Sequence, residues 1–213
     1  MAKQLLALVL LQSLLQQPSQ PQRKVSGAGV TSNRDPNLRV QLPASAKYVG
    51  ADRWILYGIA DCELHAFVEA GPDKNVQRLY WIQFEGYLPS KPDLAHTYDS
   101  PRHTKIGGLD FFVDTWPRAD GEKSQPGSDR EHIEALIRSK GYSMPAGMMY
   151  VRLVHLLDEK KRRELMIIYG EDLAPTGLTA ADLKEGGKSR DRWPELENGL
   201  VDRAQQSISL SAR

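Results

Sequence analysis

Apolar and polar side chains alternate at the start of the folded part of the chain. The stretch RWILYGIADCELHAFVEAG, residues 53–71, alternates with a period of two, and the turn residues of GPDKNVQ follow it. The stretches RLYWIQFEGY, residues 78–87, and GLDFFVDTW, residues 108–116, repeat the pattern. A period of two is typical of a strand with one face in a core. We therefore predict three strands, the first bent at Gly58, with the first two paired as an antiparallel hairpin.

The middle of the chain carries the clearest helix signals. In GSDREHIEALIRSKGY, residues 127–142, Ser128 stands at the expected N-cap, and Glu131 three residues later completes the pattern of a capping box. Gly141 fits the position after the last turn, where glycine commonly ends a helix. The pattern predicts a helix between Ser128 and Gly141.

Two more strands and two more helices are predicted after this helix. MMYVRLVHLL, residues 148–157, and ELMIIYG, residues 164–170, are apolar on both faces, which is typical of central strands. The basic cluster between them fits a solvated turn. Thr179 with Asp182 predicts the start of a short helix, and Pro194 fits the first turn of the last helix.

The predicted order of elements is therefore β-β-β-α-β-β-α. It lacks the regular alternation of strands and helices that marks a parallel sheet. We predict an α+β fold in which a twisted antiparallel sheet of five or more strands packs with two main helices. Residues 46–213 are expected to form a single domain, because their number suits one hydrophobic core.

The first 45 residues differ in character from the rest. An apolar run from Leu5 to Leu15 follows Lys3; it is too short to span a bilayer but fits the apolar region of a signal peptide. Residues 16–45 are rich in Gln, Ser, Pro and Asn and predict a linker. We expect an exported protein, periplasmic or secreted, without an integral membrane span. A cytoplasmic protein whose N-terminus is an amphipathic helix is the alternative.

Composition narrows the classes of function. The chain has 28 Lys and Arg residues against 27 Asp and Glu residues, and no long basic run, so nucleic acid is not an expected partner. With Cys62 as its one cysteine, it can form no internal disulfide and no cysteine-rich zinc site. The common hydrolase, metalloprotease and calcium-binding signatures do not occur. We expect no metal and no cofactor.

Large aromatic rings stand among the acids on the polar sides of the first three strands. A solvent-facing strand carries acids readily, but repeated rings leave much apolar area in water unless something covers them. A bound small molecule, a second copy of the protein or part of the same chain is the expected cover. The residues predicted to bind a ligand there are Trp81, Gln83, Tyr87, Phe112, Asp114, Trp116 and Arg152. For Arg152, a structural pair with an aspartate is the competing interpretation.

One set of side chains suggests acid–base chemistry. His65, with Glu63, Glu85 or Asp110 beside it, offers an imidazole that titrates near neutrality and a carboxylate to orient it. His65, Glu85 and Asp110 are the candidate catalytic residues. The competing interpretation is an ordinary surface salt bridge between His65 and Glu63.

The loop between the second and third strands, residues 87–107, is unusually long for a compact domain. It carries His96, Tyr98, Asp99 and His103, which we name as candidate lid residues. Two histidines and an aspartate are a weak zinc motif without helical spacing. The loop is expected to cover the sheet, either over a ligand or across a sheet edge.

Three functions therefore stay open. The first is an exported, non-enzymatic protein that binds a small molecule or has an accessory role. The second is a small acid–base enzyme of hydrolase or isomerase type. The third is an interaction module that buries its aromatic and acidic face in a homo-oligomer or against another protein.

Overall fold

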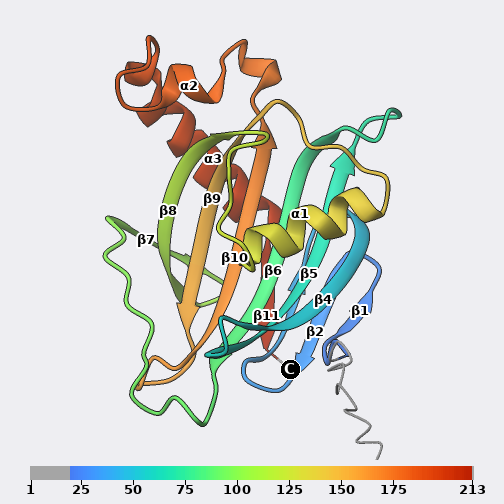
Figure 1. The fold of residues 1–213 in the computed structure, drawn as a ribbon, viewed down its shortest axis with the longest axis vertical. Helices are drawn as coiled ribbons and strands as arrows, with labels where there is room; N and C mark the ends of the chain where they lie inside the picture. The colour runs from blue at the N-terminus through green and yellow to red at the C-terminus, as the bar shows by residue number, and fades with distance from the viewer. Residues whose placement is uncertain (1–19, 213) are drawn as a thin grey trace, which may run out of the picture.

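The structure, a computed structural model, describes residues 20–212 and is built on a seven-stranded antiparallel sheet (Figure 1). Each strand is hydrogen-bonded to the next in the order β4-β5-β6-β10-β9-β8-β7. In that order, the strands are β4 (Lys47–Leu56), β5 (Ala60–Ala70), β6 (Val76–Tyr87), β10 (Arg163–Asp172), β9 (Gly147–Leu156), β8 (Leu109–Ala119) and β7 (Arg102–Ile106). The α+β class with an antiparallel sheet is confirmed.

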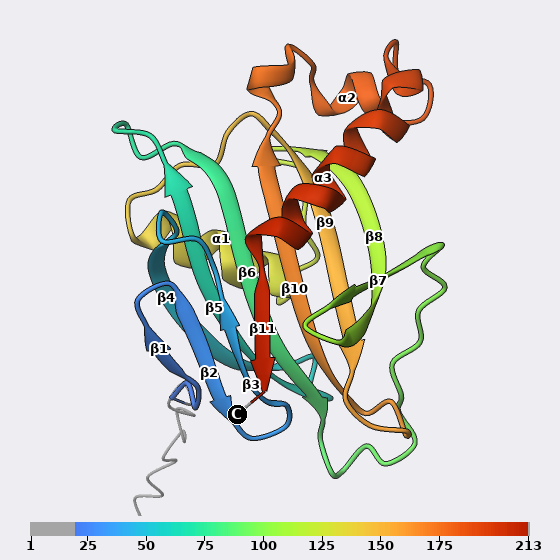
Figure 2. The same ribbon diagram turned by 180° about the vertical axis from the view of Figure 1, so that it is seen from behind.

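A second, four-stranded sheet lies against one face of the large sheet (Figure 2). Its strands, in the order of the sheet, are β1 (Lys24–Ser26), β2 (Gly29–Asn33), β3 (Asn37–Gln41) and β11 (Ser209–Ala212). The linker predicted for residues 16–45 is therefore wrong from Lys24 onward. Val30, Leu38 and Val40 are buried, and β3 pairs with the C-terminal strand β11, a partner that local composition cannot indicate. The predicted signal-like run, Leu5 to Leu15, lies outside the described residues.

The predicted strand order is incomplete because the first predicted strand is two strands. Tyr57 and Gly58 have φ angles of 48° and 71°, and the Ile59 N–H donates to the Leu56 carbonyl. Two successive positive φ angles are typical of the type I′ turns found in hairpins. Three residues separate Leu56 from its partner Ala60, so even-numbered side chains face the same side of both strands. The alternation therefore runs on through the turn and hides the break between β4 and β5. The short strands β1, β2, β3, β7 and β11 were also missed.

The predicted helices form, although one cap differs. Helix α1 (Asp129–Ser139) begins after Ser128, but the Ser128 side chain makes no cap hydrogen bond. Glu131 instead accepts the Gly127 N–H at 2.6 Å. Helix α2 (Ala180–Leu183) has the capping box of Thr179 and Asp182, and α3 (Trp193–Ser207) has a proline in its first turn. Two short 3₁₀ helices, η1 (Ala174–Thr176) and η2 (Arg190–Arg192), complete the described elements.

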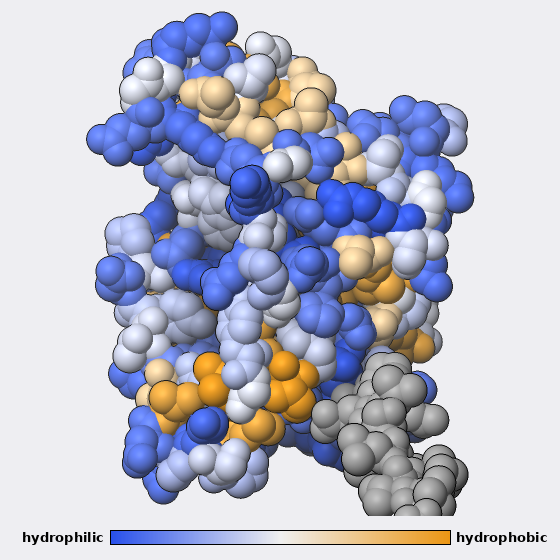
Figure 3. All heavy atoms as spheres, viewed as in Figure 1, coloured by the Kyte–Doolittle hydropathy of each residue, from blue (hydrophilic) through white to orange (hydrophobic). Residues whose placement is uncertain are grey.

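Both faces of the large sheet are covered. Helix α1 lies across one face, and the small sheet with α3 covers the other (Figures 1 and 2). Ile133 and Ile137 of α1 pack in a core with Trp81, whereas Leu200 and Val201 of α3 belong to the core on the opposite face. Figure 3 shows the α1 side as largely hydrophilic, with apolar areas near its upper end, towards its lower end and along one edge. The sheet therefore has two buried faces, which we call the α1 face and the α3 face, and each has its own group of polar residues.

Candidate functional site

A cleft of about 660 Å³ opens where the turn between β2 and β3 faces the ends of β5 and β6. This volume is within the range of small-molecule sites, which run from about 300 to about 1,000 Å³. Its charged and aromatic or apolar lining includes Arg23, Arg34, Asp35, Asp61, Glu63, Phe84, Glu85, Tyr87, Leu88, Pro89, Arg163 and Glu164.

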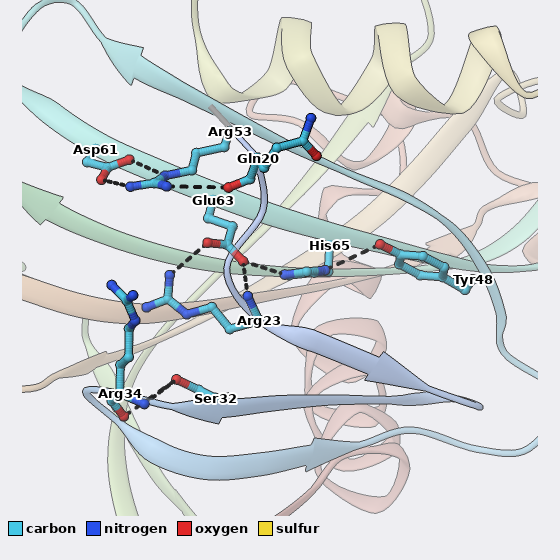
Figure 4. Close-up of polar contacts among 9 residues, drawn as sticks. All are labelled: Gln20, Arg23, Ser32, Arg34, Tyr48, Arg53, Asp61, Glu63 and His65. Carbon is cyan, nitrogen blue, oxygen red and sulfur yellow. Dashed lines mark hydrogen bonds and ion pairs between the residues drawn. The ribbon is translucent and has the colours of Figure 1, made fainter. Parts of the chain in front are cut away.

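A buried ionic cluster lies beside this cleft (Figure 4). His65 Nε2 lies 2.9 Å from Glu63 Oε1, and both side chains are only 1 % exposed. The main-chain N–H of Arg23 donates to Glu63 Oε1 at 2.8 Å, and its Nη1 donates to Oε2 at 3.0 Å. The hydroxyl of Tyr48 lies 3.4 Å from His65 Nδ1. The surface salt bridge expected between His65 and Glu63 is therefore wrong, because the pair is buried beneath the N-terminal segment.

Glu63 keeps its charge in this cluster. Burial alone would raise its pKa, but the hydrogen bonds from His65 and Arg23 outweigh burial and lower the pKa to about 2. A carboxylate with several donors is stabilised as the anion. Glu63 therefore ties the chain around Arg23 to the large sheet, and this bond fixes one wall of the cleft.

Several of the charges that line the cleft are paired with neighbouring side chains. Asp61 accepts hydrogen bonds of 2.9 and 2.6 Å from Arg53, and Asp35 is paired with Arg163. The exposed Arg34 guanidinium has no ion pair and no side-chain hydrogen bond among the residues that the structure describes. In Figure 4 its side chain extends from the turn after β2 towards Arg23.

Arg23 leaves a second donor in the same cleft. Its guanidinium lies over the ring of Phe84, 4.2 Å from the centroid, and its Nε is buried without a hydrogen-bond partner within residues 20–212. A buried N–H without a partner is costly and is commonly met by a group from outside. Arg34 therefore brings a guanidinium without an ion pair to a cleft that Glu85 and Glu164 also line, and Arg23 keeps a buried, unsatisfied N–H beside it.

Of the predicted ligand-binding residues, Tyr87 lines this cleft, and the others lie on the α1 face, away from it. Trp81 and Phe112 belong to the core beneath α1, and Trp116 stacks on Tyr150 with ring centroids 5.5 Å apart. Trp81 Nε1 donates to Gln83 at 2.9 Å, and the Gln83 amide donates to Glu85 at 3.1 Å. The small cavity beside Tyr150 holds about 10 Å³. Such a space suits at most a water molecule, so the rings are sheltered by packing.

The predicted catalytic set is not assembled. In the register of β5 with β6, His65 is opposite Ile82 and Cys62 is opposite Glu85, so His65 and Glu85 lie on opposite faces of the sheet. The side chain of Asp110 is 70 % exposed and lies 3.5 Å from Lys105. Alternation alone could not show this, because both faces of β5 are buried and neither marks the solvent side.

Glu85 instead faces a carboxyl group that the sequence did not single out. Glu164 of β10 is directly opposite Glu85, on the α1 face, and is only 2 % exposed. The pKa of each is raised to about 7, mainly by burial. The nearby Asp129 contributes to both shifts and the charge of Glu85 contributes to that of Glu164, whereas hydrogen-bond donors, such as Tyr98 for Glu164, act in the opposite direction. Glu164 is the first residue of the apolar run ELMIIYG. An acid in a predicted central strand is the feature of the sequence that could have marked Glu164 as a site residue.

Cys62 and Asp129 complete this acidic group. The thiol of Cys62 and the carboxyl groups of Glu85 and Asp129 lie within 4.8 Å of one another. Burial raises the pKa of all three, so at neutral pH they hold protons more readily than free carboxyl and thiol groups do. We assign no metal site here, because a metal needs deprotonated ligands.

The predicted cover is a loop of the same chain. His96 Nδ1 lies 3.1 Å from Glu164 Oε2, and the Tyr98 hydroxyl donates to that oxygen at 2.6 Å. Tyr87 stacks on His96 with a centroid distance of 4.4 Å. The ring centroids of His103 and Phe112 lie 4.7 Å apart. Asp99 is exposed.

The loop also contacts the sheet at two of the predicted ligand-binding residues, Asp114 and Arg152. Ser100 donates to Asp114 Oδ2 at 2.8 Å. Arg152 donates to the same oxygen from Nε at 3.2 Å and from Nη2 at 2.7 Å. Arg152 therefore has the structural role that competed with ligand binding.

Comparisons with known proteins give no family for this chain: no family model, no curated protein and no solved structure matches it. Within residues 20–212, no helix combines the length and apolar character that crossing a membrane requires.

Proposed function

We propose that this protein is a non-enzymatic binding protein that takes a small molecule with one anionic group into the cleft between its two sheets. The observation that carries the proposal is the unmatched Arg34 guanidinium beside the unsatisfied Nε of Arg23. A guanidinium fits a carboxylate or a phosphate with two parallel hydrogen bonds. The Phe84 ring beneath Arg23 supplies an apolar surface for the rest of the ligand.

The two other functions have weaker support. The acid–base enzyme needs His65 near Glu85 or Asp110, and the sheet separates His65 from Glu85. The interaction module needs an uncovered aromatic face, and α1 with the loop already covers Trp81 and Phe112. Export stays part of the proposal, on the apolar run at the N-terminus. Deleting residues 5–15 should leave the protein inside the cell if this is correct, whereas unchanged secretion of the deletion variant would contradict it.

A matched pair of probes tests the binding proposal. Ligand-observed NMR with the full chain compares small aromatic carboxylates, such as benzoate, with the corresponding amides. The carboxylates should bind and the amides should bind more weakly, because only the carboxylates bring a charge to Arg34. Replacing Arg34 by Ala should weaken carboxylate binding by about tenfold to about a hundredfold, since a hydrogen bond to a charged group contributes about 1.5 to 3 kcal/mol.

Arg138→Ala is the control, because Arg138 is an exposed arginine of α1 on the other face of the sheet. Its carboxylate binding should equal that of the unchanged protein. Equal binding of carboxylates and amides, or equal losses in the two arginine variants, would overturn the proposed site.

A further inference from the structure

The paired carboxyl groups Glu85 and Glu164 are an unusual arrangement in a sheet. Side chains directly opposite on neighbouring antiparallel strands have Cβ atoms about 4.5 to 5.5 Å apart, and like charges there are destabilising. Among the described residues no cation pairs with Glu85; its carboxyl group accepts from the Gln83 amide and lies beside the Cys62 thiol. The pair therefore favours a state in which at least one proton is retained.

The groups around the pair add to the negative charge more than they relieve it. Asp129 of α1 is a third acid, and His132 of α1, which could offset it, is bound to Asp52 of β4 at 2.7 Å. Arg152 of β9 lies on the same face of the sheet as Glu164, but within residues 20–212 its side chain donates its hydrogen bonds to Asp114 of β8. Ionisation of one carboxyl group is therefore tolerable, and ionisation of both is not compensated.

The first ionisation should fall on Glu164. The Tyr98 hydroxyl donates to it and Arg152 lies near it, and both lower its pKa against the effect of burial. With Glu164 ionised and Glu85 protonated, the Tyr98 hydrogen bond is retained and strengthened by the charge. Only the loss of the second proton, from Glu85, sets two opposed negative charges within the pair.

Of the elements that keep water from the pair, residues 88–101 are the one held mainly by polar contacts. Within this loop, all of which the structure describes, His96 is the only buried residue. By contrast, α1 is held by the buried Ile133 and Ile137. The loop contacts the pair through His96 and Tyr98, which bind Glu164. It is therefore the element that can open and let water solvate the pair when both carboxyl groups are charged.

The same loop also borders the cleft. Leu88 and Pro89, its first two residues, line the cleft, as Glu85 and Glu164 do. The Arg162 guanidinium holds the loop through carbonyl oxygens, among them those of Leu88 at 3.1 Å and Leu94 at 3.0 Å. A change at Glu164 therefore reaches the lip of the cleft through one continuous segment.

We propose that the Glu85–Glu164 pair is a proton-controlled latch, which holds loop 88–101 closed while the pair keeps a proton and frees the loop when both carboxyl groups ionise. The idea that the latch controls ligand access rests on the proposed binding function. The effect of the pair on the loop does not depend on that function, because the loop and the pair are present without any ligand.

Hydrogen exchange tests the latch in the full chain without ligand. Exchange of the peptides that cover residues 88–101 is followed by mass spectrometry from about pH 5.5 to about pH 8.5 and corrected for the chemical exchange rate at each pH. Loop protection should fall by about tenfold or more as the pH rises above about 7. The reason is that loss of one linked proton changes the equilibrium between the closed and the open loop by a factor of about ten for each pH unit above the pKa. Peptides of α1 should keep their protection.

Two variants complete the test. Glu85→Gln removes the second charge and should keep the loop protected across the whole range. Asp110→Asn removes an exposed carboxyl group of β8 and should respond as the unchanged protein does. Loop protection that does not vary with pH in the unchanged protein overturns the latch whatever the variants do, and an equal pH response in Glu85→Gln also overturns it. Failure of carboxylate binding to the cleft would leave these results unaffected, so the two proposals fail separately.

Discussion

Replacing Glu85 by Gln should make the folded protein more stable above neutral pH. Glutamine has nearly the same shape and still accepts a hydrogen bond from Gln83, but it carries no charge opposite Glu164. Burial is the main reason why the pKa of Glu85 is raised from 4.5 to about 7. At about 1.4 kcal/mol per pH unit, that difference corresponds to a cost on the order of 3 kcal/mol for ionising Glu85 in the folded state.

The direction of the pH dependence follows from the raised pKa. Between about pH 4.5 and about pH 7 the folded state binds more protons than the unfolded state, so the free energy of unfolding falls as the pH rises through this window. His96 acts in the opposite direction, because burial lowers its pKa to about 4, and its contribution is lost as the pH falls from 6.5 towards 4. Comparing the variant with the unchanged protein at each pH removes the His96 contribution.

Urea unfolding, followed by tryptophan fluorescence, measures the effect at about pH 5 and about pH 8. We expect the stability of the unchanged protein to fall between these values more steeply than that of Glu85→Gln. The difference in free energy between the two proteins should grow towards about 3 kcal/mol at the higher pH. The same pH dependence in both proteins would refute the reasoning, because it would show that Glu85 is already ionised, or already neutral, throughout the range.

Two further substitutions test other parts of the structure. Glu63→Ala should lower the free energy of unfolding by about 3 to 5 kcal/mol, because it leaves Arg23 without its partner beside a buried His65. In the unchanged protein, the stability due to Glu63 is present above its unfolded pKa of 4.5 and should be lost as the pH falls towards 2. Urea unfolding of both proteins at neutral and acid pH tests both statements. Gly170→Ala should destabilise by about 1 to 3 kcal/mol, because a Cβ at Gly170 would lie 2.8 Å from the buried Tyr150 ring; an unchanged melting temperature would show that the ring can move aside.

Much of the fold could be predicted where local chemistry decides it. The helix at 129–139, the capping box of Thr179 and the central strands β9 and β10 follow from periodicity, caps and uninterrupted apolar runs. The strands β1 to β3 could not be predicted, because β3 depends on pairing with β11 at the other end of the chain. Distant pairing leaves no mark in a window of local sequence.

The candidate sites divide in the same way. The shelter of Trp81 and the docking of the loop through His96 and Tyr98 agree with the sequence pattern, because rings among acids need a cover. The faces of β5 could not be assigned, since both are buried and a shift of one residue exchanges every side chain between them. The cleft at Arg34 was missed because its walls come from segments far apart in the chain.

Arginine side-chain NMR tests the central claim, the anion site in the cleft, most directly. The Nε–H signals of the arginines are followed while benzoate is added to the full chain. The signals of Arg23 and Arg34 should shift together and saturate with one affinity, and the signal of Arg138 should stay in place. Saturating shifts at exposed arginines elsewhere, with Arg23 and Arg34 unmoved, would contradict a binding site between the two sheets.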